Sequence, residues 1–144
     1  MRKLTLLAAI VLALVLIATV PVVAAQRTTL EASLTGEKEV PGPGDPNGRG
    51  QAEVKVYKAK VCYELEVKRI KPATAAHIHR GGPIVAGPIV VELKAPTDGS
   101  SEGCKAISKQ LSKQLREHPS HYYVNVHNVP YPDGALRGQL HRDI

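Results

Sequence analysis

The sequence predicts an all-β protein, an antiparallel Greek-key sandwich or flattened barrel of about seven to eight strands with one short helix. Short runs that alternate apolar and polar residues recur along the chain, for example over residues 61–67, and a period of two is typical of half-buried strands. Clusters rich in Gly and Pro separate these runs, as in residues 40–48 and 130–134, and such clusters form turns. Strand and turn signals in this succession favour a sandwich or barrel.

The individual elements follow from the same patterns. Strands are expected at residues 30–34, 54–56, 61–67, 74–79, 89–94, 121–127 and 135–141, with further turns at 81–83 and 97–101. One helix is expected over residues 109–117, because Ser108 suits the N-cap position and Pro119 ends the helix. Leu111 and Leu115 would lie on one face of this helix and pack against the sheet.

Residues 1–25 have the pattern of an export signal. A positively charged start precedes the almost wholly apolar residues 4–23, and small residues at 23–25 suit a signal peptidase. The apolar run is also long enough to span a bilayer, so an uncleaved anchor is the alternative. Cleavage, the preferred interpretation, would leave residues 26–144 as one β domain without a transmembrane segment, secreted or in the periplasm or cell envelope.

Composition limits the function classes. The 144 residues carry a formal net charge of +6 and include five Tyr but no Phe or Trp, so neither an aromatic stacking platform nor a dense basic stripe for nucleic acid is indicated. Small anions or anionic surface polymers would suit the charge. We find no nucleophile elbow, phosphate-binding loop or dinucleotide fingerprint, and the carboxylates are scattered singly along the chain.

Cys62 and Cys104 are the two cysteines. An exported chain meets an oxidising environment, so we expect a disulfide between them, with two independent thiols as the alternative. The loop closed would span about 40 residues, for which the chain-entropy model gives about 4 kcal/mol. Cys62 falls on the outward register of its strand, so the bond is expected to pin a covering loop to the barrel wall.

Histidine occurs in two of the predicted strands. Ala76 and Ile78 take the core positions of the first, so His77 and His79 project together from its outer side. The same alternation turns His127 outward on a later strand. Imidazole is the commonest metal ligand, and three rings that meet would form a mononuclear site with open coordination. Such a nitrogen-rich site suits Cu(II) or Zn(II), and copper has the higher affinity.

Other outward polar residues would support this site. Asn125 and Gln139 are candidates for hydrogen bonds that fix the imidazole tautomers. Arg137 is an auxiliary candidate that would draw in small anions such as superoxide. In the alternative without metal, His77 and His79 hydrogen-bond a covering loop at residues 81–87, and His127 caps the turn that leads to Pro130. The remaining histidines are interpreted as surface residues: His118, His121 and His141.

The chain resembles the chordin-type (CHRD) domain. Five segments carry the resemblance in order: residues 34–41, 76–81, 87–91, 123–127 and 132–140. Two departures from the family pattern, Ala135 in place of an acidic residue and Asn128 in place of a frequent Thr, involve no candidate ligand. The resemblance implies an exported binding or cell-envelope module, because CHRD domains occur in secreted bacterial proteins and in an extracellular antagonist of bone morphogenetic proteins.

A remoter similarity is to copper/zinc superoxide dismutases, which are Greek-key barrels. Their His-x-His strand pair is matched by His77 and His79, their later copper-binding histidine by His127, and their arginine after a Gly-rich turn by Arg137. The bridging histidine and the zinc-ligand loop have no counterpart. This similarity implies a copper site without zinc.

Three functions therefore stay open at the level of the sequence. The first is a CHRD-type module for an unidentified protein or cell-surface partner, with copper, or less favourably zinc, on the three histidines. The second is a copper-dependent, superoxide dismutase-like oxidoreductase. The third is a purely structural or interaction domain without metal. An enzyme is not the favoured interpretation.

Overall fold

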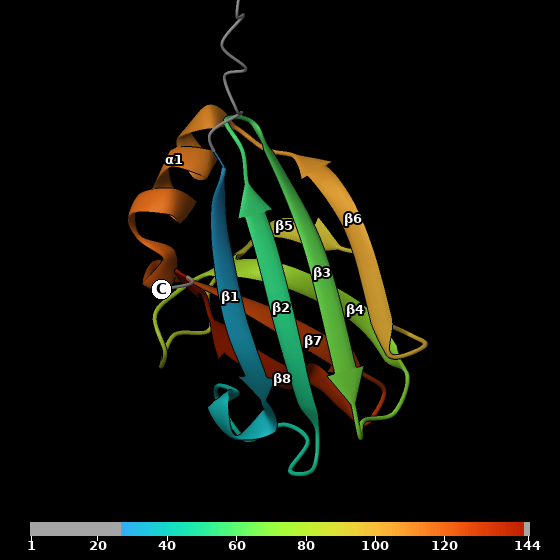
Figure 1. The fold of residues 1–144 in the computed structure, drawn as a ribbon. Helices are drawn as coiled ribbons and strands as arrows, with labels where there is room; N and C mark the ends of the chain where they lie inside the picture. Colours follow the sequence, from blue (N-terminus) through green and yellow to red (C-terminus); the bar gives the residue numbers. More distant parts are fainter. Residues whose placement is uncertain (1–26, 143–144) are drawn as a thin grey trace, which may run out of the picture.

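The computed structural model describes residues 27–142, and the predicted export signal or anchor lies outside them. The strands are β1 (Thr28–Thr35), β2 (Arg49–Val56), β3 (Lys60–Lys68), β4 (Ala73–Arg80), β5 (Ile89–Leu93), β6 (Ser100–Ala106), β7 (Tyr122–Asn128), β8 (Tyr131–Gln139) and β9 (His141–Arg142). The helices are α1 (Lys109–Glu117) and two 3-10 turns, η1 (Gly36–Lys38) and η2 (Pro119–His121). Figure 1 shows the arrangement.

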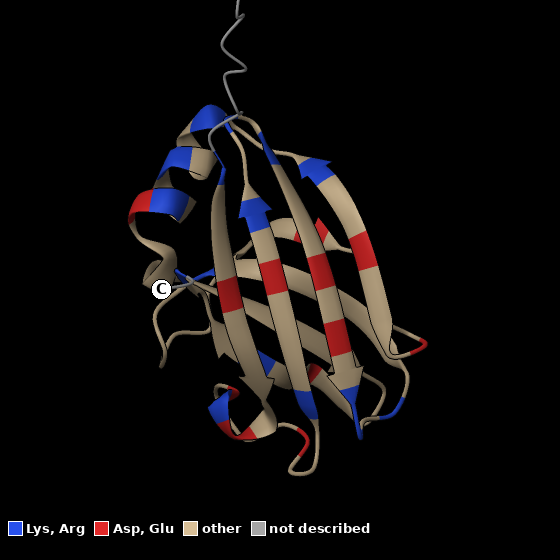
Figure 2. Ribbon diagram, viewed as in Figure 1, with Lys and Arg blue, Asp and Glu red and all other residues tan. Residues whose placement is uncertain are grey.

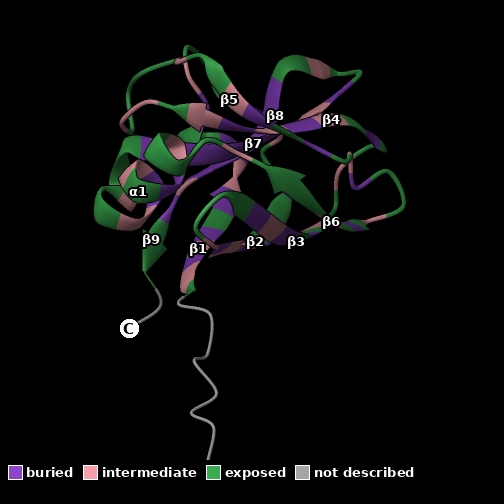
Figure 3. Ribbon diagram, turned by 90° about the horizontal axis from the view of Figure 1, so that it is seen from above, coloured by how far each residue is buried: buried purple, intermediate pink, exposed green. Residues whose placement is uncertain are grey.

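All strands form one antiparallel sheet in the order β5-β4-β7-β8-β1-β2-β3-β6, with β9 beside β1. The sheet curls into a nearly closed barrel of two layers, with α1 at one side (Figure 3). β6 returns to pair with β3, and β7 with β4, past two intervening strands each, which is a connection of Greek-key type. The predicted fold class is confirmed.

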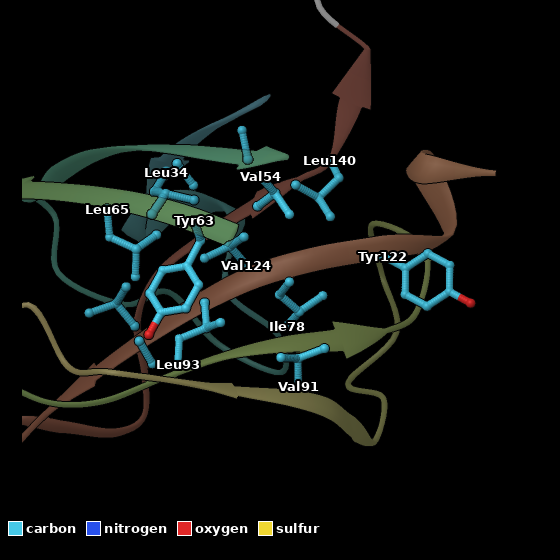
Figure 4. Close-up of a cluster of buried hydrophobic side chains, with 14 of the residues drawn as sticks. Leu34, Val54, Tyr63, Leu65, Ile78, Val91, Leu93, Tyr122, Val124 and Leu140 are labelled. Carbon is cyan, nitrogen blue, oxygen red and sulfur yellow. The ribbon is translucent and has the colours of Figure 1, made fainter. Parts of the chain in front are cut away.

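The core lies between the two layers, where the inward residues of every strand meet. Tyr63, Ile78 and Val124 come from β3, β4 and β7 and point into the same interior (Figure 4). Hydrogen bonds at the open seam complete the barrel, because the Tyr63 hydroxyl accepts from the Lys94 backbone N–H at 2.8 Å. The Ser101 hydroxyl donates to the Lys94 carbonyl at 2.7 Å. Both edge strands are thus tied together.

The predicted helix has the expected bounds. The Ser108 hydroxyl accepts from the Leu111 N–H at 3.0 Å and so caps the first turn. Leu115 is fully buried against the barrel, while Leu111 packs partly against the same core. No helix within residues 27–142 combines the length and apolar character needed to cross a membrane.

The structure corrects three local expectations. Residues 131–134, expected in a turn, begin strand β8, so the turn itself is shorter than the Gly- and Pro-rich pattern predicted. Residues 100 and 101, expected in a turn, begin strand β6, and a turn through Gly99 at φ +95° leads into it. The disulfide between Cys62 and Cys104 is confirmed. It joins directly opposite residues of β3 and β6 rather than pinning a loop, because Cys104 lies in a strand with little apolar alternation, which the pattern search missed.

Candidate metal centre

The three candidate ligands lie on adjacent strands. His77 and His79 project from the outer face of β4, and in the pairing with β7 they face Asn125 and Tyr123. His127 lies opposite Ala75, one diagonal step from His77. The irregularity beside His79 falls in the pairing with β5, so the outward alternation of β4 is kept. The structure therefore brings the three rings together, each half-buried, with one nitrogen of each within 4.8 Å of the others.

The tautomer of His79 is fixed by the covering loop at residues 81–88. Its Nδ1 lies 2.8 Å from the carbonyl oxygen of Gly87. A carbonyl can only accept, so Nδ1 carries the proton and Nε2 keeps its lone pair. This Nε2 is buried and has no hydrogen-bond partner among the described residues. Buried polar atoms are normally paired, so the atom has the property expected of a metal ligand.

His127 is held in the same way from the other side. Its Nδ1 lies 2.9 Å from the Pro132 carbonyl oxygen, which makes Nδ1 the donor and leaves Nε2 as an acceptor. That Nε2 lies 3.1 Å from Nδ1 of His77. Without an ion, His77 must therefore donate a proton from Nδ1. If an ion were bound, Nδ1 of His77 and Nε2 of His127 would be its ligands, and the His77 proton would be carried on Nε2 of that ring.

The surroundings of His77 and His79 favour the neutral form of each ring. Burial lowers the pKa of His77, and the neighbouring His127 and His79 lower it further, whereas Glu92 raises it. Burial also lowers the pKa of His79, although the hydrogen bond to Gly87 raises it. Metal ions bind the unprotonated imidazole, so a lowered pKa favours binding at neutral pH.

The distances suit a single ion of the first transition row. Two nitrogens that bind one ion at about 2.0 to 2.1 Å lie at most about 4.2 Å apart. The pair from His77 and His127 already meets this limit at 3.1 Å. Because all three candidate atoms lie within 4.8 Å, closure by less than an ångström brings the set within reach of one ion.

Arg137 holds the covering loop instead of facing the solvent. It is 1% exposed, and its guanidinium donates to the carbonyls of Gly82 at 2.7 Å and Val85 at 3.0 Å. The guanidinium carbon lies 3.4 Å from the centroid of the Tyr123 ring. On the same outer face of the sheet, the Tyr123 ring also stacks on His79, with centroids 4.8 Å apart. Arg137 therefore positions the loop that fixes His79.

The two predicted supporting amides have other partners. Asn125 donates to a carboxylate oxygen of Glu39 and, at 3.3 Å, to the Leu136 carbonyl. Gln139 donates to the carbonyls of Gly81, Ser120 and Tyr122. Backbone carbonyls, not these amides, orient the imidazoles, because the loops fold back far enough to place them within reach. A residue pattern carries no signal for a carbonyl in that role.

Sequence reasoning also missed Glu39, although it lies in one of the five family segments. Glu39 is 8% exposed, and its carboxylate lies beside Asn125 and next to the backbone of Gly134. Burial raises its pKa to about 7, while Arg137 and the hydrogen bonds from Val40 and Asn125 lower it. The remaining histidines lie elsewhere, with His118 and His121 stacked on each other at 5.4 Å beyond the end of α1.

The CHRD domain family matches residues 30–140, which include every strand that carries the site. The chain belongs to this family of binding and interaction domains. CHRD domains are typically extracellular, and the disulfide agrees with an oxidising environment. Comparison with curated proteins and with solved structures gave no match.

Proposed function

We propose that this chain is an exported CHRD binding module that holds one copper ion on His77, His79 and His127. The observation that carries the proposal is the buried Nε2 of His79, which lacks a partner among residues 27–142 and lies within 4.8 Å of one nitrogen of each of the other two rings. Two backbone carbonyls fix the tautomers that this arrangement needs. A protein or cell-surface partner would bind the module elsewhere.

Copper is preferred over zinc because of the donor set. The described cluster contains only imidazole nitrogens, which suit both ions, and Cu(II) exceeds Zn(II) in affinity for a given nitrogen site. Three ligands leave an open position for water or a small molecule. The same open position supports the second candidate, a superoxide dismutase-like reaction. Binding without turnover is the proposal, because Arg137 is turned into the loop and gives the site no exposed cation.

Copper and zinc titration of the purified domain tests the proposal. We expect one copper per chain, weaker zinc binding, and nitrogen hyperfine structure in the electron paramagnetic resonance spectrum of the Cu(II) form. His79→Ala should weaken copper binding by at least about 100-fold. His118→Ala is the matched control, because His118 is exposed, stacks on His121 and does not belong to the cluster. Equal copper binding by wild type and His79→Ala would contradict the proposal.

A superoxide removal assay on the copper-loaded protein separates the two candidates. Tight copper binding without turnover above that of free copper supports a binding module. Turnover that disappears in His79→Ala, and falls in Arg137→Ala although copper is retained, would instead establish the oxidoreductase.

A further inference from the structure

One end of the barrel carries basic side chains from three parts of the chain. The start of β1, the turn between β2 and β3, and the segment from β6 to α1 meet there, because Val56 pairs with both Thr28 and Val61, and Val61 pairs with Lys105. We call this the basic end, defined by Arg27, Lys58, Lys60, Lys105, Lys109 and Lys113. Figure 2 shows its blue segments at the top of the view.

The charge of the basic end is unbalanced. All six side chains are exposed, and residues 27–28, 56–61 and 104–113 include no Asp or Glu. Within the described part of the chain, only Lys113 has an ion pair, at 3.5 Å from Glu117. Positive potential therefore accumulates at this end, although charge elsewhere on the barrel is mixed.

Two more features of the basic end suit binding to the headgroup region of an anionic membrane. Helix α1 begins at Lys109, so its positive dipole end lies within the basic end. Tyr57 lies in the turn between Val56 and Lys58, half-buried, with the Lys60 ammonium 4.9 Å from its ring centroid. Tyrosine beside lysine is a combination enriched where proteins meet the headgroup region of bilayers.

The sequence indicates which anionic surface lies close by. The apolar residues 4–23, long enough to enter a bilayer, lead directly into Arg27 at this end. We propose that the basic end docks on a bilayer rich in anionic phospholipid, either while residues 1–25 remain attached or after their removal. Each basic residue close to such a surface strengthens binding by about fivefold. This inference is independent of the histidine cluster, which lies on the outer face of β4 and β7.

Vesicle cosedimentation at low salt tests the inference. The described barrel and its core are built from residues 27–142, and the CHRD family matches residues 30–140, so a chain of residues 27–144 is suitable. We expect it to sediment with vesicles of phosphatidylcholine containing about 30% phosphatidylglycerol, to stay in solution with pure phosphatidylcholine, and to be released by salt. The triple variant K58Q/K60Q/K105Q should bind about 100-fold more weakly.

A variant with the same change of charge is the control. K38Q/K68Q/K71Q removes three exposed lysines at the opposite end of the barrel, and it should keep most of the binding. Circular dichroism of both variants verifies folding. Equal losses in the two variants would overturn the inference, because they would show a diffuse charge effect. Binding to duplex DNA without binding to anionic vesicles would also overturn it.

Discussion

Residues alternate between inward and outward positions on both halves of the barrel, but the outward residues differ in exposure. They are mostly exposed on β1, β2, β3 and β6, the uncovered face, and mostly buried on β7 and β8, part of the covered face. On β1, β2, β3 and β6 most outward residues are polar or charged and at least partly exposed, as at Glu53 and Glu64. On β7 and β8 the outward residues Tyr123, Asn125 and Arg137 are only 3%, 2% and 1% exposed. The covering loop at residues 81–88 causes the difference at Tyr123 and Arg137, because its backbone hydrogen-bonds both side chains. A small domain can thus build a polar site outside its core by adding a lid to one side.

The uncovered face carries a row of glutamates that are far apart in the sequence. Cross-strand pairing places four glutamates from β1, β2, β3 and β6 in one row: Glu31, Glu53, Glu64 and Glu102. The row is visible as red bands in Figure 2. The carboxylates scattered along the chain are therefore neighbours in space. Lys55 partly offsets their repulsion, with its ammonium 2.6 Å from Glu53 and 3.5 Å from Glu64.

The largest expected effect concerns the edge of the uncovered face. The double variant Cys62→Ala/Cys104→Ala removes the link between β3 and β6, which spans 42 residues of sequence. We expect the free energy of unfolding in urea to fall by about 4 kcal/mol. Copper affinity under folded conditions should stay unchanged, because the disulfide lies on the opposite half of the barrel from the histidines. A loss of copper binding without unfolding would show that the two faces are coupled.

On the covered face, Arg137→Met should have the second-largest effect on the free energy of unfolding. The change leaves the carbonyls of Gly82 and Val85 without their donor, and we expect a loss of about 3 kcal/mol in unfolding free energy. Proteolysis should then cut first within residues 81–88. Arg80→Met is the control, because the exposed Arg80 guanidinium donates only to Gln114, and it should cost less than about 0.5 kcal/mol.

Glu39 makes the covered face sensitive to pH. Because burial raises its pKa to about 7 from the ordinary 4.5, the folded state binds a proton more tightly than the unfolded state. The contribution of Glu39 is therefore most favourable below pH 4.5 and is lost as the pH rises through 7. His77 and His79 act in the opposite direction, since their pKa values are lowered and their contribution is lost as the pH falls.

The variant Glu39→Gln separates these opposed contributions. Between about pH 5 and pH 8 the wild type should lose about 2 kcal/mol of stability relative to Glu39→Gln. Thermal unfolding of both proteins across this range measures the difference. Parallel curves for the two proteins would mean that the Glu39 carboxyl has an ordinary pKa despite its burial.

The sequence predicted the local features of the fold and site but not the long-range ones. Period-two alternation correctly assigned the core side of β4 and β7, and thereby the three histidines to one face, because alternation is a local property of the chain. The loop carbonyls of Gly87 and Pro132, the partners of Asn125 and the row of glutamates all depend on register or on loops folding back. These are long-range properties that alternation does not encode.

The smallest expected effect tests whether repulsion within the row of glutamates lowers the stability of the fold. Glu102 lies directly opposite Glu64 and has no ion pair in the described chain. Glu102→Lys would replace a like-charge pair with an opposite-charge pair, so we expect a gain of about 0.5 kcal/mol in unfolding free energy. High salt should remove the gain, because exposed charges are screened. Glu117→Lys, which breaks an exposed pair on α1, should give no gain. A gain of similar size in both variants would indicate that the gain does not depend on neighbouring glutamates, and the row would then have no energetic meaning of its own.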